Sequence, residues 1–146
     1  MALPAPLSMA TNGPRTLGGL VQFAVRLEAV SATDTIPLHY APDGDSVIAS
    51  LSFVPDATLA ADNSDYWAFQ LQNKGTDGTG TTAMMTEVDT RAASLNGLTA
   101  FDAEDFTLTA DSVNDGEVAA IVLTKNGSAA DLAGTFILTV KRAVTY

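Results

Sequence analysis

The clearest pattern in the sequence is an alternation of apolar residues with small or polar ones over residues 21–28. Val21, Phe23, Val25 and Leu27 occupy the apolar positions of this stretch. A period of two residues places all four side chains on one face of an extended strand, because successive side chains of a strand point to opposite faces. The pattern therefore predicts a half-buried β-strand, which starts near Leu20.

Seven further segments combine β-favouring residues with nearby turn signals. They are residues 35–40, 46–53, 65–72, 81–88, 106–109, 117–125 and 135–145. Asp-Gly or Asn-Gly pairs, which tolerate positive φ, occur at 43–44, 77–78, 96–97, 115–116 and 126–127. Segments 58–61 and 91–95 are too short for more than one helical turn. The sequence thus predicts an all-β protein, an antiparallel β-sandwich of jelly-roll-like form.

The first nineteen residues differ from the rest in being rich in proline and glycine. Pro4, Pro6 and Pro14 fall in this stretch together with Gly13 and a Gly-Gly pair at 18–19. Such a density of proline and glycine disfavours a regular helix. We expect residues 1–19 to form an extended N-terminal arm and residues 20–146 to form the sandwich domain. The start has neither an early basic region nor a long apolar run, so we expect no signal peptide and no membrane span.

Composition and charge narrow the classes of partner. Charged residues make up 16% of the chain, and 17 acidic against 7 basic residues give a net charge of -10. An acidic surface repels phosphate backbones, so we expect no nucleic-acid partner. Three roles of this acidity stay open: repulsion between particles, complementarity to a basic patch, or adaptation to salt. The sequence has no cysteine, which excludes disulfides and thiolate ligands, and it suggests no cofactor.

Catalytic chemistry would depend on the single histidine, His39, with Asp34 or Asp43 to orient it. No G-x-S-x-G motif is present, and a histidine in a short strand is more often structural. We therefore expect no enzymatic activity and no catalytic residues.

Acidic residues occur in pairs that resemble glycosidase or calcium-binding groups. The pairs are Asp43/Asp45, Asp62/Asp65, Glu104/Asp105 and Asp111/Asp115. The segment 111–117 has some of the character of an EF-hand loop, but Val113 stands at the third ligand position and Glu117 comes too early. Capping and solvation explain these carboxylates better, so we assign no metal site.

Two further stretches invite a functional interpretation and favour a structural one. In residues 74–82, Lys74 precedes the glycines, which is the wrong order for a phosphate-binding loop, so a flexible connection between strands is expected. Trp67 and Phe69 share one face of a strand with Leu71, which predicts core packing. Tyr66 is on the other face and is the more plausible surface contact.

The succession of residues 63–75 and 78–82 resembles the head-decoration, or capsid cement, proteins of tailed bacteriophages. The resemblance continues in order through 98–100, 106–109, 113–118 and 134–140, so that it extends from about Val21 to Val140. It consists of strand alternation and turn residues, a pattern that tail, fibre and appendage modules also have.

The resemblance implies a virion protein on the outer surface of the capsid. It implies binding across subunits of the major capsid protein, frequent assembly as a homotrimer, and no catalytic residues. We expect the arm to contact the capsid through apolar anchors and one charged anchor, namely Leu3, Leu7, Met9, Leu17 and Arg15. The alternatives are a phage tail or fibre module that binds a ligand such as carbohydrate, and a merely disordered tail in place of a binding arm.

Overall fold

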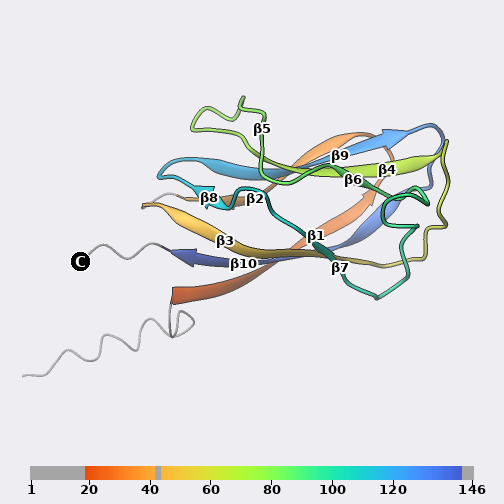
Figure 1. Cartoon of the computed structure of the whole chain (residues 1–146), viewed down its shortest axis with the longest axis horizontal. Helices are drawn as coiled ribbons and strands as arrows, with labels where there is room; N and C mark the ends of the chain where they lie inside the picture. Colours follow the sequence, from red (N-terminus) through yellow and green to blue (C-terminus); the bar gives the residue numbers. More distant parts are fainter. Residues whose placement is uncertain (1–18, 42–43, 143–146) are drawn as a thin grey trace, which may run out of the picture.

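Ten β-strands form the regular structure of the computed structural model, which describes residues 19–41 and 44–142 (Figure 1). No α-helix occurs within those ranges. The strands are β1 (Leu20–Val30), β2 (Asp34–Tyr40), β3 (Ser46–Pro55), β4 (Tyr66–Asn73), β5 (Thr82–Ala83), β6 (Val88–Asp89), β7 (Glu104–Phe106), β8 (Ser112–Val113), β9 (Val118–Asn126) and β10 (Leu132–Arg142). The predicted all-β class is confirmed.

The strands form two antiparallel sheets of five strands that pack face to face. One sheet has the order β1-β10-β3-β7, with β8 also paired to β3. The other has the order β2-β9-β4-β5, with β6 also paired to β4. The short strands β5 and β6 can be counted as one interrupted strand, and β7 and β8 as another, which gives eight strands in chain order. The first of these eight strands pairs with the eighth, the second with the seventh, the third with the sixth and the fourth with the fifth. This nesting is the winding of a jelly roll, so the sandwich prediction is correct in its topology as well.

The core lies between the sheets and follows from the alternation of side chains. Trp67, Phe69 and Leu71 on β4 have no exposed surface, as predicted. The Phe53 ring of β3 contacts those of Phe69 and Phe136, at centroid distances of 5.6 and 4.7 Å. This cluster joins the two layers across the middle of the sandwich.

The segment 81–88, predicted as one strand, is interrupted. Met84 and Met85 are both about 1% exposed, and only β5 and β6 on either side of them pair with β4. Two consecutive buried side chains do not fit the alternation of a strand, so the chain kinks between them. The strand expected at 106–109 instead ends at Phe106, and β8 was not predicted.

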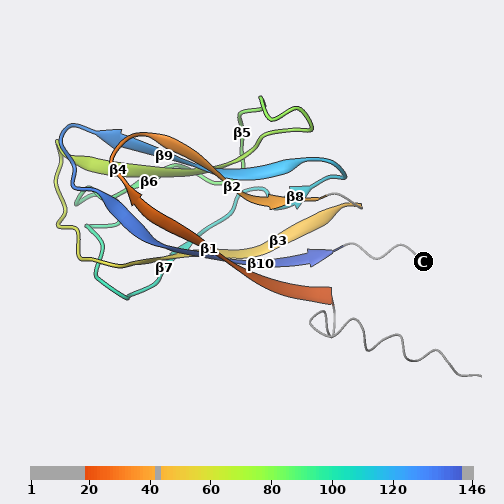
Figure 2. The same ribbon diagram turned by 180° about the vertical axis from the view of Figure 1, so that it is seen from behind.

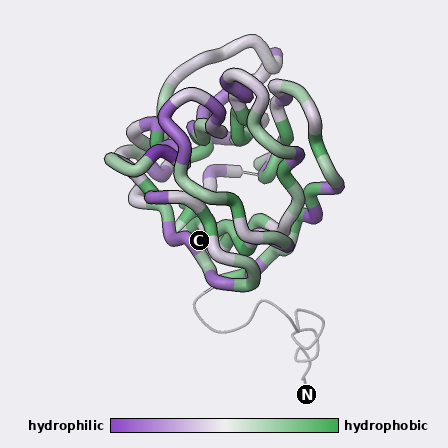
Figure 3. The backbone as a smooth tube through the Cα atoms, turned by 90° about the vertical axis from the view of Figure 1, so that its right-hand side faces the viewer, coloured by the Kyte–Doolittle hydropathy of each residue, from purple (hydrophilic) through white to green (hydrophobic). Residues whose placement is uncertain are grey.

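β1 and β2 are the long edge strands of the two sheets. Each pairs with a single strand, β10 or β9, among the described residues. A connection of three residues, 31–33, joins them, so both edges lie on the same side of the sandwich (Figure 2). In the end view of Figure 3, hydrophobic and hydrophilic stretches are interspersed along the chain.

Candidate functional site

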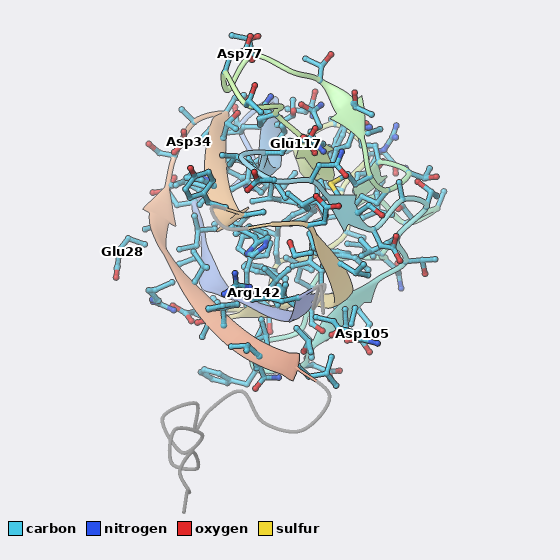
Figure 4. All side chains as sticks on the ribbon, turned by 90° about the vertical axis from the view of Figure 1, so that its left-hand side faces the viewer. Glu28, Asp34, Asp77, Asp105, Glu117 and Arg142 are labelled. Atoms are coloured by element: carbon cyan, nitrogen blue, oxygen red, sulfur yellow. The ribbon has the colours of Figure 1, made fainter. Side chains whose placement is uncertain are left out.

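A cleft opens between the sheets where β1 starts and where β2 and β10 end. Its volume is about 330 Å³, and we call it the edge cleft. Its walls come from four strands and one turn, through Phe23, Leu38, His39, Tyr40, Ala41, Gly44, Ser46 and Arg142. Figure 4 views this end of the molecule and labels Arg142.

The mouth of the edge cleft is apolar. Tyr40 is 55% exposed and Phe23 is 42% exposed, and Leu20 at the start of β1 is 46% exposed. Among the described residues only one other large hydrophobic side chain is exposed, Phe101 in a loop. A grouping of exposed rings at a strand edge is a feature of binding surfaces.

His39 forms the polar wall of the edge cleft. Its Nε2 lies 2.7 Å from the Ser46 hydroxyl, and its ring centroid is 6.1 Å from that of Phe23. Partial burial, together with the positive charge of Arg142, lowers the pKa of His39 below its ordinary value. The imidazole is therefore held in its neutral form.

The His39–Ser46 pair has the spacing of a base and a nucleophile, but the serine is buried. Ser46 is 2% exposed, so its hydroxyl faces the protein interior. Asp34 is at the opposite end of β2, where its carboxylate accepts a hydrogen bond from the Thr35 amide. The other candidate, Asp43, lies outside the described residues. The structure thus does not bring Asp34 to His39.

Three carboxylates of the acidic pairs, Asp45, Asp62 and Asp115, cap backbone amides in loops. Asp45 accepts a hydrogen bond from the Asp115 amide, and Asp115 accepts one from the Gly44 amide. Two backbone amides, of Asp65 and Ser64, lower the pKa of Asp62. Within residues 19–41 and 44–142, no three His, Asp or Glu side chains converge as metal ligands.

Glu117, the last residue of the EF-hand-like segment, is held by local hydrogen bonds. Its carboxylate accepts hydrogen bonds from the Asn73 side chain at 2.7 Å and from the Asn114 amide at 2.8 Å. These donors lower its pKa, the Asn73 side chain most. Glu117 therefore joins the β8–β9 loop to the end of β4 rather than presenting a ligand for calcium.

The glycine-containing connection after β4 is built from turns. Asp77 accepts hydrogen bonds from both the amide and the hydroxyl of Thr79, each at 2.9 Å. The Lys74 ammonium donates to the Gln72 amide oxygen at 2.9 Å. These hydrogen bonds hold the loop as a connection between strands. The position of Lys74 before the glycines had predicted such a connection.

Tyr66 is half-buried, and a cation covers its ring. The Arg91 guanidinium lies 4.5 Å from the ring centroid and pairs with Asp89 at 2.6 Å. A cation stacked on a tyrosine stabilises the fold, and here it also covers the ring. One face of the Tyr66 ring is therefore occupied within the fold, and its role as a surface contact stays a prediction.

A second hollow, of about 620 Å³, follows β3 between β7 and β8. The register of β3 against β10 shifts there, because Ala49 is an extra residue between Ile48 and Ser50. Asp105 and Asp111 contribute to its walls. Asp105 accepts a hydrogen bond from the Ser52 hydroxyl at 2.6 Å, so this carboxylate is used within the fold.

The outer face of the second sheet is uncharged along its two central strands. On this face Ala68, Gln70 and Gln72 of β4 are paired with Thr124, Val122 and Ala120 of β9. The Gln72 amide donates to the Gln70 amide oxygen at 2.7 Å. We call these six residues the neutral face; Ala68 and Ala120 are buried within the chain, at 3% and 2% exposed, so Gln70, Gln72, Val122 and Thr124 form its accessible part.

The capsid contacts expected from the sequence, Leu3, Leu7, Met9, Arg15 and Leu17, lie outside the described residues. The edge cleft was not predicted from the sequence. Pro37, a residue typical of edge strands, was the available signal that β2 is exposed along one side. The approach of β1 to β2 depends on sheet order, which no local pattern gives.

Comparison with known proteins gives little similarity. No family model matches the sequence. No curated protein matches it either. Within the described ranges, no helical segment has the length and hydropathy that crossing a bilayer requires.

Two solved structures with similar chains are of infectious bursal disease virus. The chain from the Gx strain is 16% identical with a TM-score of 0.36, and the match covers 87% of this chain and 33% of that one. The chain from the Gt strain is 15% identical with a TM-score of 0.30, covering 87% and 32%. This chain therefore spans about a third of the length of those chains. TM-scores this low support no conclusion about the fold. The jelly-roll architecture therefore rests on the sheet order of this chain alone.

Proposed function

We propose that this chain is a structural virion protein that decorates a tailed-phage capsid and stabilises it. In this proposal the protein sits on the outer surface of the capsid and binds across subunits of the major capsid protein. The resemblance of residues 21–140 to capsid cement proteins suggests this proposal. The neutral face is the structural observation that supports it.

The neutral face suits lasting contact with another protein. The chain carries a net charge of -10, yet the six residues of the neutral face carry none of it. Depletion of charge is the compositional mark of an interface core. Charged residues such as Asp77 and Glu28 lie at the periphery instead (Figure 4).

The fold fits the proposal by analogy. Jelly rolls are common in viral capsid domains and also in lectins, so the architecture alone does not decide between them. Sites repeated over a capsid lattice give avidity to linked copies, and a homotrimer would gain strong attachment from modest single contacts. The proposed trimer follows from the resemblance, whereas the capsid-binding arm follows from the proline- and glycine-rich character of residues 1–19.

The test is reconstitution on capsids of the phage that encodes the protein. Purified chain is added to capsids lacking it, and cryo-electron microscopy and sedimentation measure attachment. We expect ordered density at lattice positions and greater resistance of the shell to heat. A variant lacking residues 1–19, checked by circular dichroism for retained β-structure, should not bind. Absence of the full chain from the shell would contradict the proposal.

A second candidate function is a carbohydrate-binding module of a phage tail or fibre. The edge cleft favours it, because the exposed rings of Phe23 and Tyr40 beside His39 resemble a sugar-stacking surface. Glycan-array binding that is lost in Tyr40→Ala, without affinity for capsids, would support this function over the first.

We propose no catalytic role for the chain. Ser46 is buried behind His39, and that placement does not suit attack on a substrate. Any turnover that is lost in His39→Ala would contradict this part of the proposal.

A further inference from the structure

No described segment covers the outer edge of β1, which is a long template for another strand. β1 has eleven residues and pairs with β10 alone among the described residues. Unpaired N–H and C=O groups along an edge attract a further strand, and proteins block such edges with charges, prolines or covering segments. β2 has Pro37 and a register shift near it, whereas residues 20–25 of β1 contain neither a proline nor a charge.

The same half of β1 leaves an apolar surface open. Phe23 points toward the other sheet yet is 42% exposed, because nothing in the described chain extends the first sheet beyond it. The edge cleft, with Leu38 and Tyr40 opposite, continues this surface. A strand added to β1 would place every second side chain over the cleft.

The sequence before β1 has the pattern that such a strand requires. Apolar side chains occur at every second position from residue 3 to residue 9, as Leu3, Ala5, Leu7 and Met9. Pro4 and Pro6 stand between them. In a strand, alternate residues direct their backbone groups to opposite sides. Both prolines, which lack an N–H, would then face solvent while the apolar set pairs with β1, as on an edge strand.

We infer that residues 3–9 dock in the free protein as an added antiparallel strand on β1 of the same chain, with Leu7 and Met9 over the edge cleft. One such register places Met9 beside Val21, Leu7 beside Phe23 and Ala5 beside Val25. The open edge is then covered, and the exposed rings become buried.

The chain length favours docking on the same copy. Ten residues, 10–19, connect the segment to β1, and a connection of this length easily reverses direction. Gly19 at its end has φ +69°, a left-handed conformation suited to a turn. A short flexible tether gives a millimolar effective concentration, which outcompetes a second copy in dilute solution.

The inference concerns the free protein and does not depend on a capsid. It adds one condition to the proposed function, because a capsid site for Leu3, Leu7 and Met9 must compete with β1. Arg15 and Leu17, in the connection, would stay available to the capsid in either state.

Disulfide trapping in the full chain tests the inference, since the protein has no native cysteine. The variant with Ala5→Cys and Val25→Cys should oxidise to a disulfide within one chain. The matched control pairs Ala5→Cys with Ala24→Cys, whose side chain is on the outer face of β1. We expect the first pair to form about tenfold faster than the control. Equal rates would overturn the inference, and so would disulfides formed only between two chains.

Hydrogen exchange provides a second measurement that does not depend on cysteine geometry. Leu7→Asp should raise the exchange of β1 amides about tenfold, because it removes the covering strand. Ser8→Asp changes a side chain on the opposite face of the segment and should leave exchange as in the parent. No difference between the two variants would overturn the inference. Capsid binding takes no part in either experiment, so failure here is distinct from failure of the proposed function.

Discussion

Gly134 lies on β10 where the chain passes closest to the aromatic cluster. A Cβ atom there would lie 2.5 Å from Cζ of Phe53 and 2.5 Å from the Val54 carbonyl oxygen. Phe53 is fully buried against Phe69 and Phe136, so its ring has no room to withdraw. Glycine is therefore required for close packing and not for a left-handed φ.

We predict that Gly134→Ala lowers the free energy of unfolding by about 1–3 kcal/mol, which is typical of an overpacked core. Urea denaturation measures this, with Thr135→Ala, expected within about 0.5 kcal/mol of the parent, as control. Because Phe53 causes part of the clash, beside the Val54 carbonyl oxygen, Phe53→Leu should cost less in the Gly134→Ala background than alone. Additive effects would contradict the contribution of Phe53 to the clash.

His39 makes stability depend on pH. Burial and, to a lesser extent, the charge of Arg142 lower its pKa in the folded state. As pH falls through about 6.5, the unfolded chain takes up a proton before the folded chain does. The unfolded state then binds more protons, so stability is present above this pH and decreases below it.

We predict that urea midpoints of the parent protein fall between pH 7.5 and pH 5.5 more than those of His39→Gln, whose side chain does not titrate. Carboxylates with lowered pKa values, such as Asp62 and Glu117, lose their contribution only at lower pH. They affect both proteins equally. Identical pH dependence in the two would show that His39 is not responsible.

In the proposed function, strands β4 and β9 contact the capsid through the neutral face. Val122 is partly buried at its centre, beside Gln70. We predict that Val122→Lys weakens capsid binding about tenfold or more, because a charge in an interface core loses hydration without gaining a partner. Val122→Thr, which keeps shape and neutrality, should bind within about threefold of the parent.

Thermal unfolding of both variants supplies the control for folding. The lysine stem can lie along the sheet while its ammonium stays in water, so little loss of stability is expected. If Val122→Lys folds and binds like the parent, the neutral face is not the capsid contact.

Alternation predicted the long strands well and the short ones poorly. β1, β2, β3, β4 and β9 start and end within two residues of their expected limits, because each has one buried face and a continuous partner. β5 to β8 contain two or three residues each, and tertiary contacts hold them. Met84 shows why: its amide donates to the Leu71 carbonyl oxygen at 2.8 Å, a contact that depends on where β4 already lies.

The candidate site was less accessible to sequence reasoning than the fold. The edge cleft joins Phe23, Tyr40 and Arg142, which are far apart in the chain and meet because β1 and β2 are edges and β10 pairs with β1. The order of the strands in the sheets determines which of these residues come together. The hydrophobic period of a segment does not indicate that order. Local structure was more predictable, since the capping role expected of turn carboxylates is seen in the hydrogen bonds of Asp62 and Asp77.

The distribution of charge over the molecule leads to a prediction about salt. The net charge is -10, but the proposed contacts are the neutral face and the leading segment, in which Arg15 is the one charged anchor. Exposed charges lying away from a contact are screened at moderate salt, with a Debye length of about 10 Å at 0.1 M. Capsid affinity should therefore change less than about threefold between 50 and 500 mM NaCl, as measured by sedimentation.

Asp77→Asn is the matched control for this salt dependence, because Asp77 is exposed in the β4–β5 connection and outside the neutral face. It should leave both the affinity and its salt dependence unchanged. A steep loss of affinity with salt would mean that the acidic loops face a basic capsid patch. The neutral face would then be the side of the sandwich turned away from the shell, and the orientation of the proposed complex would be reversed.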